Sequence, residues 1–400
     1  MSVIFLLTVF QACKEEEYSP LNKGGSAPAK VSDVKIAPLP GAARISYQVP
    51  DDKNFLYVKA EAEIRPGVIR EIKASYYTSE LVIDGFSDTT EFVVRLYSVG
   101  RNDMVSEPEI VTVVPKTPPV FSVFESLKET IVETFGGIKF EMDNPSGAEV
   151  RIYVNTTDSL GNMVPAEIFY TSAATDRFSV RGYDTDARPF SIYVQDRWGN
   201  TSGTYENIFH PLLEKKLDKT KFRSTPLTGD MNDIIQQNRP ITNLWDDALT
   251  DATMYQTNSG IKSLPHTFTI DLGVKAYLSR VVTHGRVSTN AGFLYNAGMP
   301  QQWEIYGSTD PNPDGSLDES WIPLREGPCV SFKPSGLPLG EVSDDDYQRQ
   351  LNGEEFEFDR SDILVRYIRF SINSAWGGLS TSFFNMTEIT LFGNVEEEIQ

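Results

Sequence analysis

Cysteine and histidine are scarce in this sequence. Among 400 residues there are two cysteines, Cys13 and Cys329, and three histidines. Two cysteines exclude a disulfide framework, because small disulfide-stabilised domains contain several cysteine pairs. The histidines form no HExxH motif, and the sequence contains neither a GxSxG motif nor a phosphate-binding loop. The enzyme classes defined by these motifs are therefore excluded.

Basic residues are also few. The sequence has 36 Lys and Arg against 56 Asp and Glu, which gives a formal net charge of -20. Nucleic-acid binding depends on clusters of Lys and Arg that neutralise phosphates, and such clusters are absent. We exclude nucleic acid as a partner. The acidic charge suits an exposed surface that faces neutral ligands. The alternative is that it only keeps the protein soluble.

Long hydrophobic runs are missing as well. The longest near the N-terminus, Val3–Phe10, is far shorter than the roughly 20 residues that a membrane-spanning helix needs. It is typical of a secretory signal. Ala12-Cys13 and the charged segment Lys14–Glu17 follow it, and this pattern resembles a bacterial lipoprotein signal of the surface-exported type. The resemblance implies that Cys13 is lipidated after residues 1–13 direct export, so that the protein is anchored to the outer membrane at the cell surface. The alternative is a buried N-terminal strand with an incidental cysteine.

Aromatic and turn-forming residues are plentiful. The sequence has 17 Tyr and 23 Phe beside 24 Pro and 28 Gly. This composition predicts many short strands joined by turns, and hence an all-β protein. The length predicts several cores, because single cores stop growing at roughly 250 to 300 residues. Residues 14–30 hold Pro20, Pro28 and a glycine pair with almost no apolar content, which is typical of a flexible tether.

Two sandwich domains are predicted after the tether. About seven short alternating segments fit into residues 31–115, the spacing of an immunoglobulin or fibronectin-like β-sandwich. The prolines in Lys116–Pro119 interrupt the pattern and indicate a boundary. Residues 116–211 form a second such domain, whose end at Phe190–Asn200 repeats the pattern of Phe92–Asn102. Convergent strand and turn patterning is the alternative to a true repeat. A short connector, Leu212–Leu217, has an amphipathic pattern that predicts a helix.

Three stretches in the remaining part, residues 218–395, carry a family resemblance. They are Pro265–Gly273 with Leu278–Arg286, then Gln302–Asp310, then Val365–Phe370 with Ser374–Gly378 and Thr387–Gly393. In this order they resemble the discoidin family, also called coagulation factor V/VIII type C, of galactose-binding-like domains. The resemblance implies a β-jelly-roll sandwich. Alternation agrees, since Phe268, Ile270 and Leu272 fall on one face of a strand, as do Ile368, Phe370 and Ile372.

The family resemblance also implies a structural calcium site. In the family, an early Asp-rich loop and a late Glu hold the ion. The corresponding residues here are Asp246, Asp247, Asp251, Thr253 and Glu388. Carboxylate and carbonyl oxygens at close spacing suit calcium, which takes six to eight of them. The alternative is an ordinary turn with solvated carboxylates.

Ligands of the family bind where loops gather at one end of the sandwich. The loop Arg286–Met299 mixes aromatic, amide and basic side chains. A flat ring covers the apolar face of a sugar, while amides and guanidinium groups bond its hydroxyls. The predicted glycan-binding residues are His284, Arg286, Asn290, Phe293, Tyr295, Asn296 and Trp376. The alternative is that Phe293 and Tyr295 pin the loop to the sandwich and that Trp376 packs under the closing strand.

The whole arrangement resembles lipoproteins encoded beside starch-utilisation-type outer-membrane transport systems. It implies a non-catalytic surface protein of a polysaccharide-utilisation system that captures glycan beside transporters and other glycan-binding proteins. Two alternatives stay open: a glycan-degrading hydrolase or lyase, and a protein-binding adhesin or structural lipoprotein. Length argues against an enzyme, since three sandwiches leave no room for a separate catalytic barrel.

Overall fold

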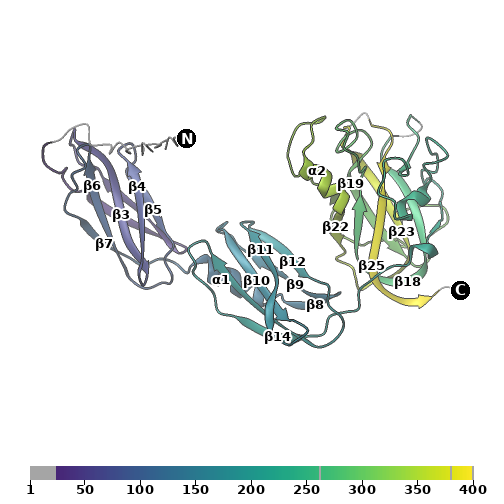
Figure 1. Ribbon diagram of the computed structural model, residues 1–400, viewed down its shortest axis with the longest axis horizontal. Helices are drawn as coiled ribbons and strands as arrows, with labels where there is room; N and C mark the ends of the chain where they lie inside the picture. The colour runs from purple at the N-terminus through teal and green to yellow at the C-terminus, as the bar shows by residue number, and fades with distance from the viewer. Residues whose placement is uncertain (1–23, 261–262, 379–380, 399–400) are drawn as a thin grey trace, which may run out of the picture. The chain divides into compact units, whose positions relative to one another are not determined.

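The computed structural model describes residues 24–260, 263–378 and 381–398. Within these ranges the chain is almost entirely strands, with two short α-helices (Figure 1). The prediction of an all-β fold is confirmed. None of the described helices is long and apolar enough to cross a membrane. Cys13 and the predicted export signal lie outside the described residues, so lipidation stays a prediction.

By their internal contacts the residues divide into two compact units. The first takes the chain up to Val132, together with Ile138–Val180 and Ala187–Phe209. The second takes Glu133–Gly137, Arg181–Asp186 and the chain from His210 onward.

Two β-sandwiches make up most of the first unit. In the first sandwich, a sheet of order β1-β2-β5 packs on a sheet of order β4-β3-β6-β7. The strands are β1 (Ser32–Leu39), β2 (Ala42–Gln48), β3 (Phe55–Arg65), β4 (Val68–Ser75), β5 (Glu80–Asp84), β6 (Phe92–Gly100) and β7 (Glu109–Val113). Alternation places Ile45, Val58 and Leu96 in the core with no exposed surface.

The second sandwich begins with helix α1 (Pro119–Lys128), which has proline in its first turn, where the missing amide hydrogen costs nothing. Its sheets have the orders β11-β10-β13-β14 and β12-β9-β8. The strands are β8 (Val132–Thr134), β9 (Gly137–Asp143), β10 (Val150–Thr157), β11 (Met163–Thr171), β12 (Thr175–Val180), β13 (Arg188–Asp196) and β14 (Tyr205–Phe209). Phe140, Ile152 and Ile192 are fully buried at its centre.

The third sandwich fills most of the second unit. Its main sheet has the order β15-β25-β18-β23-β19-β20, and β16, β21 and β22 pair at its sides. The elements are β15 (Lys215–Lys216), η1 (Lys219–Lys221), β16 (Arg223–Ser224), η2 (Ile241–Trp245), β17 (Tyr255–Gln256), β18 (His266–His284), β19 (Pro300–Ser308), β20 (Ile322–Pro323), β21 (Cys329–Val330), α2 (Asp344–Asn352), β22 (Glu354–Glu357), β23 (Leu364–Ala375), β24 (Asn385–Met386) and β25 (Glu388–Glu398).

The core of the third sandwich follows the predicted alternation. Phe268, Ile270 and Leu272 on β18 are buried, as are Ile368, Phe370 and Ile372 on β23. The rings of Phe268 and Phe370 stack with centroids 4.9 Å apart. Strand β18 changes partners along its length, from β23 to β25, around Gly273. Gly273 has a φ of +67°, and a Cβ there would lie 2.6 Å from the Lys221 carbonyl oxygen, so the bend requires glycine.

The connector prediction was wrong. Residues 212–217 form no helix; instead Lys215 and Lys216 form β15 and pair with Gly393 and Phe392 of β25. A free edge of β25 competes with the weak helical tendency of so short a segment, because a short helix is marginal without packing.

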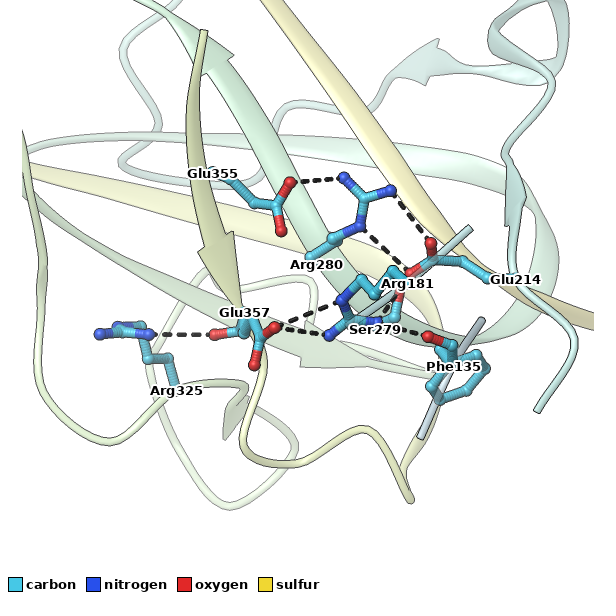
Figure 2. A network of polar contacts seen from close by, with 8 residues as sticks. All are labelled: Phe135, Arg181, Glu214, Ser279, Arg280, Arg325, Glu355 and Glu357. Atoms are coloured by element: carbon cyan, nitrogen blue, oxygen red, sulfur yellow. Dashed lines mark hydrogen bonds and ion pairs between the residues drawn. The ribbon is translucent and has the colours of Figure 1, made fainter. Parts of the chain in front are cut away.

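A network of charged side chains lies in the second unit (Figure 2). At its centre, the Glu214 carboxylate accepts hydrogen bonds from Arg280, at 3.0 and 3.2 Å, from Arg181, at 3.1 Å, and from the Ser279 hydroxyl. The Glu214 side chain is only 9% exposed. Arg280 also donates to Glu355, and Arg181 to Glu357. Glu214 thus joins two partly buried guanidinium groups, each of which also pairs with a second carboxylate.

We expect Glu214→Gln to lower the free energy of unfolding of the second unit by about 1–3 kcal/mol, because charge-assisted hydrogen bonds become neutral ones. Urea unfolding followed by tryptophan fluorescence measures this. The control is Glu319→Gln, since the Glu319 side chain is exposed. Equal stabilities of the two variants would contradict the role of Glu214.

Cys329 is buried, at 1% exposure, and is not in a disulfide. Burial raises the pKa of its thiol to about 12. Cys329 therefore acts as a small apolar core residue rather than as a nucleophile.

Candidate functional site

The loop between β18 and β19 is a compact, internally bonded turn. The Asn290 carbonyl accepts hydrogen bonds from the amides of Phe293 and Leu294, at 2.9 and 3.0 Å. The Asn296 side chain donates to the Ala291 carbonyl at 3.1 Å. Tyr295 has a positive φ of 47°. The loop that carries the predicted ligand residues is therefore held in one shape by its own backbone.

Tyr295 lies beneath this loop rather than on its surface. The side chain is fully buried. Its hydroxyl donates to the Phe332 carbonyl at 2.8 Å and accepts from the Gln350 amide at 2.9 Å. Burial raises the pKa of Tyr295. Its ring meets that of Trp376 edge to face, with centroids 5.2 Å apart. Tyr295 thus holds the loop to the sandwich, which was the alternative to a contact with ligand.

Arg286 is locked against two neighbours. Its guanidinium donates two hydrogen bonds to the Asp251 carboxylate, one of them 3.2 Å long, and lies 3.5 Å from the centroid of the Phe293 ring. Arg286 is only 7% exposed. A bidentate pair together with a cation–π contact fixes both the guanidinium and the ring. Asp251, a predicted calcium ligand, is therefore a partner of the predicted glycan-binding loop.

His284 faces the interior. It is 8% exposed, and its Nδ1 lies 2.9 Å from the Gln350 carbonyl oxygen. Burial lowers the pKa of His284, so the ring is neutral at pH 7. His284 positions the end of β18 against helix α2 and does not present its Nδ1 to solvent.

One exposed aromatic residue beside the loop, Phe332, was not predicted from the sequence. Phe332 is 60% exposed, whereas its neighbour Ser331 is 4% exposed. The Phe332 carbonyl is the acceptor for Tyr295, which places Phe332 next to the loop. Period-two alternation over Cys329–Phe332 was a usable signal, but alternation alone does not tell which face of the strand points to solvent.

The other predicted glycan-binding residues keep some accessible surface. Asn290 is exposed, and Phe293, Asn296 and Trp376 are half-buried.

Glu354 connects Phe332 to helix α2 and, through Gln350, to the end of β18, where the loop Arg286–Met299 begins. We call this region the loop end of the third sandwich. The Glu354 carboxylate, at 2% exposure, accepts hydrogen bonds from the Phe332 amide at 2.8 Å, the Ser331 hydroxyl at 2.7 Å and the Gln350 side chain at 2.9 Å. Gln350 in turn accepts from the Gly285 amide at 2.8 Å. Helix α2 and the start of β22 thereby hold the loops on both sides of Tyr295.

Two of the five predicted calcium ligands, Asp247 and Glu388, face an ammonium group. Lys219 Nζ lies 2.8 Å from Glu388 Oε1 and 2.7 Å from Asp247 Oδ1. The other Glu388 oxygen accepts from the Asp247 amide at 2.8 Å. Burial raises the pKa of Glu388 to about 7, and the neighbouring Lys219 opposes this shift.

The remaining predicted ligands are engaged elsewhere. Asp246 accepts from the Ala248 amide at 2.9 Å, Thr253 lies 3.0 Å from the Thr250 hydroxyl, and Asp251 pairs with Arg286. Across the described residues, no group of three His, Cys, Asp or Glu side chains is arranged to hold a metal ion. This donor set does not fit calcium, because its two central carboxylates already share a cation.

Three family models match the chain, and each is described as a domain of unknown function. They cover residues 28–115 (DUF4959), 116–220 (DUF5126) and 245–393 (DUF5000). No curated protein matches the sequence. Among solved structures, a carbohydrate-binding module, CBM32-3, from a family 31 glycoside hydrolase of Clostridium perfringens is 18% identical over 45% of this chain and 95% of its own, with a TM-score of 0.32. A two-domain fibronectin type III segment of chicken tenascin is 12% identical over 46% of this chain and 99% of its own, with a TM-score of 0.22.

A solved SusE-like protein is more similar. It is 30% identical to this sequence, and the alignment covers 70% of this chain and 100% of the SusE-like protein, with a TM-score of 0.45. Sequence identity at this level extends over the whole length of the SusE-like protein. The chain belongs to the family of SusE-like proteins.

Proposed function

We propose that this protein is a non-catalytic glycan-binding protein that captures polysaccharide through the loop end of the third sandwich. The observation that carries the proposal is that the loop Arg286–Met299 presents the exposed Asn290 and the half-buried Phe293, whose ring is fixed by Arg286. The exposed Phe332 lies next to this loop, since its carbonyl accepts a hydrogen bond from Tyr295. Aromatic rings beside amide groups match the apolar faces and hydroxyls of sugars. Membership in the SusE-like family supports a place in a polysaccharide-utilisation system.

The structure divides the predicted ligand residues by role. Asn290, Phe293, Asn296 and Trp376 retain accessible surface, and Phe332 joins them as a contact residue. Tyr295, His284 and Arg286 are buried and bonded to the protein, so we assign them to positioning.

A lipid anchor at Cys13 would hold this binding end at the surface of the outer membrane, beside transporters and other glycan-binding proteins. We expect the affinity of a single site to be weak, with a dissociation constant on the order of mM to µM, or about -4 to -8 kcal/mol. Display of many copies on one surface would raise the avidity for a long polysaccharide.

A glycan array with the purified protein, followed by calorimetry on the best ligand, tests the proposal. We expect Phe332→Ala and Asn290→Ala each to weaken binding at least about 5-fold, because each removes roughly 1 kcal/mol or more of stacking or hydrogen bonding. The control is Ile69→Ala in the first sandwich, where the apolar side chain is 73% exposed. Unchanged affinity in both variants would move the site elsewhere.

The same panel separates the alternatives. New reducing ends after incubation with polysaccharide would identify a hydrolase or lyase. A blank array together with a specific protein partner in pull-downs would identify an adhesin.

A further inference from the structure

Lys219 extends from a short 3₁₀ turn into the interior of the third sandwich. The turn η1 is capped by Asp218, whose side chain accepts a hydrogen bond from the Thr220 amide at 3.0 Å. The turn is anchored on the next residue, Phe222, which is buried. The Lys219 side chain is 6% exposed, although its neighbour Lys221 is 35% exposed. The local geometry therefore selects Lys219 to point inward.

The ammonium of Lys219 bridges two segments that are far apart in the sequence. Its partners are Glu388 at the start of β25 and Asp247 in the loop after η2. The Glu388 side chain is 3% exposed. A carboxylate buried to this degree is strongly destabilising unless it is paired and hydrogen-bonded. Lys219 supplies the charge, and the amides of Asp247 and Ile389 supply further hydrogen bonds.

A bound divalent cation and an ammonium in this position exclude each other. Calcium requires six to eight oxygen ligands. Here one oxygen of each carboxylate faces the ammonium, and the second Glu388 oxygen is bonded to a backbone amide. Asp251, another of the predicted calcium ligands, is paired with Arg286.

We infer that Lys219 is a built-in cation that takes the place of calcium, holding Asp247 and Glu388 together so that the third sandwich folds and keeps its loop end without a metal ion. The role belongs to this one lysine. Lys216 also contacts Asp247, at 2.9 Å, but its side chain is 47% exposed, and within the described residues the ion pair of Glu388 is with Lys219.

Thermal unfolding of the purified protein followed by tryptophan fluorescence tests the inference. Four of the five tryptophans, Trp245, Trp303, Trp321 and Trp376, follow residue 210, so the signal reports mainly on the third sandwich. We expect the same Tm in excess chelator and in millimolar calcium. We expect Lys219→Met to lower the Tm by at least about 5 °C, because it leaves Glu388 buried without a counter-ion. The matched control Lys216→Met should change the Tm little.

Two results would overturn the inference: a Tm of the unaltered protein that falls with chelator or rises with calcium, or a Lys219→Met variant as stable as Lys216→Met. If Lys219→Met does not fold, the double variant Lys219→Met/Glu388→Gln decides. Removing the orphaned carboxylate should restore folding if the charge pair is the reason for the loss. A double variant that also fails to fold would show that Lys219 acts through packing, contrary to the inference.

Discussion

We expect Arg369→Met to destabilise the third sandwich by about 3–5 kcal/mol, because it breaks a fully buried ion pair. The side chain of Arg369 on β23 is 3% exposed and that of Asp230 is 0% exposed, with 2.7 Å between Arg369 Nη2 and Asp230 Oδ1. Arg369 also donates to the Gly315 carbonyl at 2.6 Å. Removing the guanidinium leaves Asp230 charged, buried and without its cation.

Urea unfolding with tryptophan fluorescence measures this effect. The control is Arg360→Met, which removes the same type of side chain from an exposed pair with Asp362. Exposed pairs contribute about 0–1 kcal/mol, so the control should remain close to the unaltered protein. Similar unfolding midpoints for the two variants would show that the buried Arg369–Asp230 pair does not stabilise the third sandwich.

The second large effect is expected at Glu354, the carboxylate under the loop end. Glu354→Ala leaves three buried donors, those of Ser331, Phe332 and Gln350, without their acceptor. An unsatisfied buried polar group costs about 1–3 kcal/mol, so we expect a loss of about 3 kcal/mol or more. Because Phe332 is one of the three, glycan affinity should fall as well.

Glu354 is expected to stabilise the loop end, and Phe332 is expected to contact glycan. Measuring both the urea midpoint and the glycan affinity of each variant distinguishes these two roles. Phe332→Ala should weaken glycan binding with little change in urea midpoint, because the ring is exposed. Glu354→Ala should lower both. The control is Glu341→Ala, since the Glu341 side chain is exposed. If Glu354→Ala keeps full affinity at temperatures where it is folded, Phe332 does not contribute to the site.

The architecture was within reach of the sequence because strand alternation is a local property. Phe268, Ile270 and Leu272 are two residues apart, so any extended backbone puts them on one face. Helix α2 carried a local signal too, which went unused: Ser343 and Asp346 form a capping box, the serine accepting from the Asp346 amide and the aspartate accepting from the Ser343 amide.

The direction in which the loop side chains point could not be predicted from a single sequence. Tyr295 faces inward because Gln350, 55 residues later, bonds its hydroxyl. Asp247 and Glu388 were identified as neighbours through a family resemblance. The residue that compensates them is Lys219, 169 positions before Glu388, and nothing in its local pattern distinguishes it from Lys216 or Lys221. Such pairings depend on tertiary folding, which residue patterns alone do not specify.

The Lys219 ammonium is a covalent part of the polypeptide, whereas a bound metal ion is not. A dissociable ion stabilises a fold by mass action, in proportion to the logarithm of its free concentration, and its contribution is lost on dilution or when a competitor sequesters it. A cation attached to the main chain has no free concentration. Its contribution to the Asp247 and Glu388 pair therefore does not depend on the free concentration of calcium, and a chelator cannot remove it.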